Sequence, residues 1–149
     1  MRAGAVMRFR PVAAAWLICL ALAGGSYLRP QDAPKKHPID QWLSACMEKD
    51  PSTQGMLLCL NEAYRRWDAE LNRVYQELMS RLTPDERAAL RESQRAWLKQ
   101  RDEMFKLLDA IYGRKEGTMF LTMRAADRVE IVQKRALELL GVLDVLNIE

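Results

Sequence analysis

The stretch Ser93–Asp102 carries the residue types in this chain that are best suited to specific polar recognition. At helical spacing its apolar stripe is interrupted by Gln94 and Arg101. An amide or guanidinium that faces a protein core is costly unless partners satisfy its hydrogen bonds. We therefore expect a defined polar network here, and the alternative is a site for a ligand or a partner protein.

The expected network joins two helices and consists of Asn72, Gln94, Arg101 and Asp102. Within it we predict that Gln94 bonds to Asn72. We also predict that Arg101 pairs with a carboxylate of the neighbouring helix, such as Glu70.

Residues for catalysis or metal binding are scarce. The chain has one histidine, His37, which lies in a proline-flanked segment, and it has neither a Ser-His-Asp set nor a glycine-rich phosphate loop. Carboxylates are plentiful, but they alternate with Lys and Arg as a solvated helix surface does, which disfavours a catalytic carboxylate pair. We expect no enzyme activity, no cofactor and no metal site.

Residues 1–23 have the pattern of a signal peptide. Three arginines precede an uncharged run from Val12 to Ala23, which ends in small residues before Gly24. The run is shorter than the roughly 20 residues of a membrane span, so we expect cleavage near Ala23, export to the periplasm or medium, and no stable span afterwards. A retained anchor is the alternative, and Ile18 before Cys19 disfavours a lipoprotein.

Export also changes the charge of the chain. Cleavage of residues 1–23 would remove 3 of the 23 basic residues and none of the 20 acidic ones. The formal charge of the mature chain would then be 20 minus 20, or zero. Without a basic surplus we expect no nucleic-acid binding.

The mature chain keeps two cysteines, Cys46 and Cys59. In an oxidising compartment we predict that they form a disulfide, which would stabilise the fold by about 3 kcal/mol in the chain-entropy model. A redox role is disfavoured because the chain lacks a Cys-x-x-Cys motif.

The periodicity predicts an all-α protein in which three main helices pack up-down-up behind a short stapled helix. Residues 24–38 form an extended tether and residues 39–149 the helical domain. The boundary signals, among them a Thr83–Glu86 capping box and a stop at Gly113, place helices at 40–49, 53–82 and 84–112, and a last one opening at Gly117-Thr118.

The chain resembles the LprI-type lysozyme-inhibitor family, whose members are small exported bacterial helical proteins. The resemblance rests on the following residues: Cys46 and Cys59, the segments Glu70–Tyr75 and Leu90–Trp97, Arg101-Asp102, Gly117-Thr118 and Arg128. Within these segments we expect Leu71, Tyr75 and Trp97 to fill the core, because they recur at helical spacing. Many family members have a second cysteine pair, where this chain has Glu103–Phe105 and Met119–Met123 instead.

The resemblance implies a binding protein that occupies lysozyme or another cell-wall hydrolase. The loop 113–118 and the loop between Cys46 and Cys59 are the candidate contacts, although neither is distinctly acidic. The alternatives are an interaction, immunity or assembly module for another envelope partner, and a structural or stress-related envelope protein.

Overall fold

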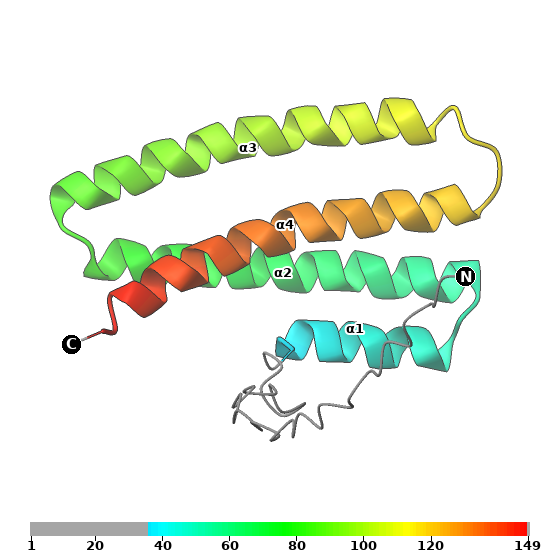
Figure 1. The fold of residues 1–149 in the computed structure, drawn as a ribbon, viewed down its shortest axis with the longest axis horizontal. Helices are drawn as coiled ribbons and strands as arrows, with labels where there is room; N and C mark the ends of the chain where they lie inside the picture. The colour runs from blue at the N-terminus through cyan, green and yellow to red at the C-terminus, as the bar shows by residue number, and fades with distance from the viewer. Residues whose placement is uncertain (1–35, 149) are drawn as a thin grey trace, which may run out of the picture. The chain divides into compact units, whose positions relative to one another are not determined.

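The computed structural model describes residues 36–148, and the predicted leader and most of the predicted tether lie outside this range. Four helices follow one another within it: α1 Pro38–Lys49, α2 Thr53–Arg81, α3 Pro84–Tyr112 and α4 Met119–Val145 (Figure 1). Residues 36–148 contain no strand, which confirms the all-α prediction for this part of the chain. Pro38 is the first residue of α1, so the helix begins two residues before its predicted start and the tether cannot extend to residue 38.

Side chains that the sequence singles out define the ends of the long helices. Ser52 accepts a hydrogen bond from the Gly55 amide at the start of α2. The predicted capping box is formed at the start of α3, where Thr83 and Glu86 bond reciprocally. Gly117 has φ +103°, a conformation that glycine adopts without strain, and it turns the chain into α4.

The hydrophobic core lies between α2 and α4. Its largest fully buried side chains are Trp67, Leu71, Val74, Leu78 and Val132. The two helices run in the same direction, since Thr53 lies 3.5 Å from Thr118 at one end and Arg81 donates to Asn147 over 2.8 Å at the other.

Helix α3 runs in the opposite direction to α2 and α4 and lies apart from them along much of its length (Figure 1). Leu90 is its one buried residue, whereas α2 buries eight. The inward face of α3 is nevertheless the predicted one, because Gln94, Trp97 and Arg101 are half-buried and their neighbours are exposed. The bundle is therefore uneven, with a tight α2–α4 pair and a loosely attached α3.

Helix α1 packs against the first half of α2. The predicted disulfide between Cys46 and Cys59 is present, with their Cα atoms 5.9 Å apart. The Arg66 guanidinium stacks 3.9 Å from the centre of the Trp42 ring, which adds a cation–π contact to the staple. None of the helices in the described range has an apolar stretch long enough to cross a membrane.

Candidate binding cleft between α2 and α3

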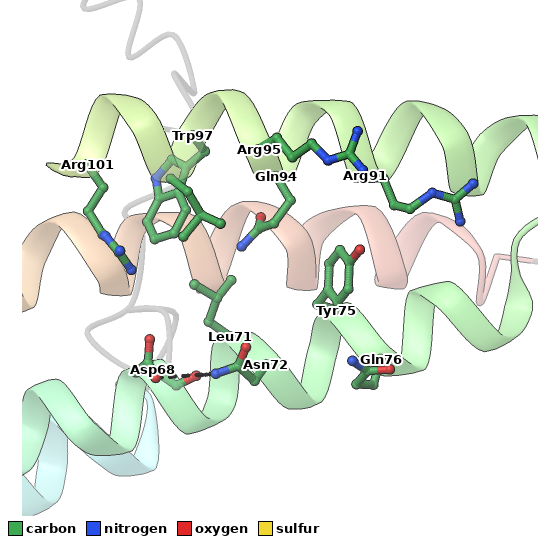
Figure 2. Close-up of a pocket in the computed structure, with 11 residues that line it drawn as sticks. Asp68, Leu71, Asn72, Tyr75, Gln76, Arg91, Gln94, Arg95, Trp97 and Arg101 are labelled. Carbon is green, nitrogen blue, oxygen red and sulfur yellow. Dashed lines mark hydrogen bonds between the residues drawn. The ribbon is translucent and has the colours of Figure 1, made fainter. Parts of the chain in front are cut away.

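A cleft of about 370 Å³ opens where α3 stands away from α2. Six of the seven residues that the sequence analysis places in the polar network and the motif core line this cleft: Leu71, Asn72, Tyr75, Gln94, Trp97 and Arg101 (Figure 2). Two consecutive helices thus bring these residues to one place.

Helix α2 supplies one wall of the cleft. Leu71, only 2% exposed, points toward α3, and Tyr75 points the same way one turn later (Figure 2). The Asn72 amide donates to the backbone carbonyl of Asp68 over 2.9 Å and to its carboxylate over 3.3 Å. Asn72 therefore fixes the position of the Asp68 carboxylate within the cleft.

Helix α3 supplies the opposite wall, on which Arg101, Trp97, Gln94 and Arg91 follow one another (Figure 2). The Arg101 guanidinium donates to Asp102 over 2.7 Å and lies 5.4 Å from the centre of the Trp97 ring. These contacts hold Arg101 against the aromatic surface of its own helix. Asp102 itself is exposed and does not line the cleft.

The predicted pairings between α2 and α3 are wrong. Gln94 accepts from Arg135 of α4 instead of bonding to Asn72. Glu70 accepts from Arg73 over 2.7 Å instead of from Arg101, and this hydrogen bond lowers the pKa of the Glu70 carboxyl. The reason is geometric. The cleft separates α3 from α2, so Glu70 bonds within one turn of its own helix and Gln94 bonds to α4.

Arg135 is the residue that the sequence reasoning missed. It is 9% exposed and donates to Ser93 over 2.8 Å and to Gln94 over 3.1 Å, both on α3. Its spacing could have indicated that it faces inward. Arg135 lies three residues after Val132 and four before Leu139, so it falls in the buried stripe of α4. The polar residue that interrupts the apolar stripe of α3, Gln94, thus finds its hydrogen-bond partner on α4.

A second polar contact joins α3 to α4 nearer the loop. Arg128 donates to both carboxylate oxygens of Asp109, over 2.6 and 2.7 Å, and lies 4.9 Å from the Phe105 ring centre. Tyr112 donates to Asp127 over 2.6 Å, and this hydrogen bond raises the pKa of the Tyr112 hydroxyl. Polar side chains therefore link α3 to α4 at two places, in addition to the apolar contacts of Leu90, Trp97 and Phe105 with the core.

The cleft presents charged, amide and aromatic groups. Its lining includes one carboxylate, Asp68, and three arginines, of which Arg95 and Arg101 are paired with Glu92 and Asp102 and Arg91 is not. Within residues 36–148 no cluster of three or more His, Cys, Asp or Glu side chains could hold a metal ion. The amides, aromatic rings and guanidinium groups can hold and orient a ligand.

Comparison with known families identifies the class of protein. The family described as "Lysozyme inhibitor LprI" matches residues 45–139, which include both cysteines, the cleft and Arg135. The chain belongs to the LprI family. The resemblance recognised in the sequence is thereby confirmed.

Solved structures support the same fold. The chain is similar to a crystal structure of an uncharacterised protein from Burkholderia thailandensis, with 35% sequence identity and a TM-score of 0.69. The match covers 73% of this chain and 55% of that one, so this chain spans about half the length of that protein. No curated protein matches the chain.

Proposed function

We propose that this protein is exported and binds a cell-wall hydrolase of the lysozyme class, blocking it by protein–protein contact. The observation that carries the proposal is the match to the lysozyme-inhibitor family over residues 45–139. The cleft between α2 and α3, with its amide, aromatic and guanidinium groups, is compatible with a binding protein. The N-terminal pattern of residues 1–23 supports export.

One end of the helical domain is suited to such an interface. The turn 50–52 and the loop 113–118 lie at the same end, because Thr53 and Thr118 are within 3.5 Å. Both candidate loops of the sequence analysis therefore contribute to one surface, which we call the loop end. Apolar side chains are exposed beside these loops: Leu58, Ile111, Met119 and Leu121. We propose that these side chains contribute apolar contacts to the interface.

The loop 113–118 carries a formal charge of +1, while the turn 50–52 contains Asp50. Arg114 and Lys115 are both exposed in the loop 113–118, which has Glu116 as its one acidic residue. Glycoside hydrolases commonly use a pair of carboxylates in their cleft, so a basic loop complements that cleft electrostatically. Because the mature chain has no net charge, this complementarity acts over short distances and gives little long-range steering.

The test is lysozyme activity against cell-wall substrate in the presence of increasing amounts of the purified, oxidised protein. We expect saturable inhibition that weakens when the Cys46–Cys59 disulfide is reduced, because the disulfide holds α1 and the turn 50–52 against α2. Absence of inhibition by the folded, oxidised protein would reject lysozyme as the target.

Matched variants locate the interface. Met119 and Val145 are the first and last residues of α4 and are 61% and 64% exposed, so they differ mainly in the end of the helix they occupy. We expect Met119→Gln to weaken inhibition and Val145→Gln to leave it unchanged. The opposite pattern would place the interface away from the loop end.

A further inference from the structure

We propose that the cleft between α2 and α3 binds an acidic N-acetylated sugar, with its carboxylate against Arg91 and its ring over the floor formed by Leu71 and Trp97. The proposal concerns a small ligand and does not rest on hydrolase inhibition.

Two charged side chains of the cleft, Arg91 and Asp68, form no ion pair within the range 36–148. Arg101 is paired with Asp102, and Arg95 donates to Glu92 over 2.6 Å. The Arg91 side chain also forms no hydrogen bond within that range, and Figure 2 shows it at the opposite end of the cleft from Asp68. A guanidinium matches the planar geometry of a carboxylate, which it can bind through two parallel hydrogen bonds.

Uncharged polar groups surround this position. Gln94 uses its carbonyl oxygen to accept from Arg135, so its amide NH₂ can donate to a ligand. Tyr75 reaches toward α3 with its hydroxyl, and Gln76 follows it on α2 (Figure 2). These groups can donate to and accept from the hydroxyl and acetamido groups of a sugar.

The apolar floor and the volume of the cleft also match a single sugar ring. Leu71, Trp97 and Leu98 give it an apolar surface between polar edges, as the face and rim of a sugar ring require. A volume of about 370 Å³ is within the range of small-molecule sites, roughly 300–1,000 Å³. A ligand with one carboxylate, several polar substituents and an apolar ring face fits this lining.

The test is a titration of the ¹⁵N-labelled purified protein, followed by amide chemical shifts, with three probes. N-acetylmuramic acid has the sugar ring, the acetamido group and a carboxylate, N-acetylglucosamine lacks the carboxylate, and N-acetylglutamate lacks the ring. We expect saturable shifts at cleft residues with the first probe and at least tenfold weaker binding of the other two. Equal binding of N-acetylglutamate would overturn the assignment of a sugar. Equal binding of N-acetylglucosamine would overturn the contact between Arg91 and a carboxylate. No binding at all, or shifts confined to other surfaces, would overturn the site.

Variants assign the contacts. Arg91→Gln should weaken binding of N-acetylmuramic acid about tenfold, and Tyr75→Phe should weaken it severalfold. Arg65→Gln is the matched control, because Arg65 is on α2 outside the cleft with a side chain 72% exposed. An unchanged dissociation constant for Arg91→Gln, in a protein whose spectrum shows it folded, would overturn the proposal.

Sugar binding in the cleft and inhibition of lysozyme can be tested separately. Binding of N-acetylmuramic acid by a protein that leaves lysozyme active would support the cleft assignment and reject the inhibitor. Inhibition that persists in Arg91→Gln, together with lost sugar binding, would support both and assign them to different surfaces.

Discussion

Arg135 on α4 donates from Nε to the Oε1 atom of Gln94 on α3 across 3.1 Å. This hydrogen bond, together with the one to Ser93, shows that α3 is attached to the domain in a different way from α2. Many buried apolar side chains pack α2 against α4, whereas α3 contributes Leu90 to the buried core, with Trp97 and Phe105 partly buried against it. Arginine side chains of α4 add polar links to α3, and the cleft lies between α3 and α2.

Replacing Arg135 with Met should lower the free energy of unfolding by about 1–3 kcal/mol, because Ser93 and Gln94 lose their shared donor. Chemical denaturation measures the loss. Lys134→Met is the control, since Lys134 is exposed on the same helix and pairs only within it. An equal effect of both substitutions would show that the contact to α3 contributes nothing.

Amide hydrogen exchange should be faster in α3 than in the middle of α2 or α4. Leu90 is the single buried residue of α3, so opening this helix exposes less buried apolar surface than opening α2 or α4. Exchange followed by mass spectrometry over peptides of each helix measures this difference. Uniform protection across the three long helices would mean that α3 opens only on global unfolding.

Replacing Cys46 and Cys59 with serine should reduce the free energy of unfolding by about 3 kcal/mol or less, as the loop they close spans a sequence separation of 13. The thermal midpoint of the double variant should match that of the reduced wild type. A midpoint equal to that of the oxidised wild type would show that contacts such as Arg66 on Trp42 suffice to hold α1.

Leu78→Ala should lower the free energy of unfolding by about 2–5 kcal/mol. Leu78 lies on α2 and is fully buried, so truncating its side chain leaves a cavity in the core. Leu58→Ala is the matched control on the same helix, at a position 60% exposed, and should change stability by less than about 0.5 kcal/mol. Denaturant midpoints of the two variants give the comparison. Similar losses would indicate that the α2–α4 core relaxes to fill the space.

The capping box at the start of α3 should make the stability of the protein depend on pH in the acid range. Hydrogen bonds from the Thr83 backbone and hydroxyl lower the pKa of Glu86 below its ordinary 4.5. Because the folded pKa is the lower one, the stabilisation is present above the unfolded pKa and is lost as the pH falls through the folded value. Glu86→Gln keeps a capping side chain without a charge, so its stability should decline less between pH 6 and pH 3 than that of the wild type. Parallel acid denaturation curves would contradict this.

Much of the helical architecture could be read from local signals. Capping residues such as Ser52 and Thr83 act within one turn, so the helix boundaries followed from the sequence to within about two residues. The periodic stripe of α2 and the inward face of α3 also followed, because helical periodicity alone decides which residues share a face. The disulfide could be predicted because two cysteines remained for one bond.

The partners of the polar residues were decided by the tertiary structure. Whether Gln94 bonds to Asn72 or to Arg135 depends on how far α3 stands from α2 and α4, and helical spacing carries no information about that distance. Arg135 could be placed in the α4 stripe from sequence, but its role depended on which helix faces it. The sequence by itself therefore determined the helices and the residues that face inward. The packing of α3 against α4 alone created the cleft and gathered the motif residues around it.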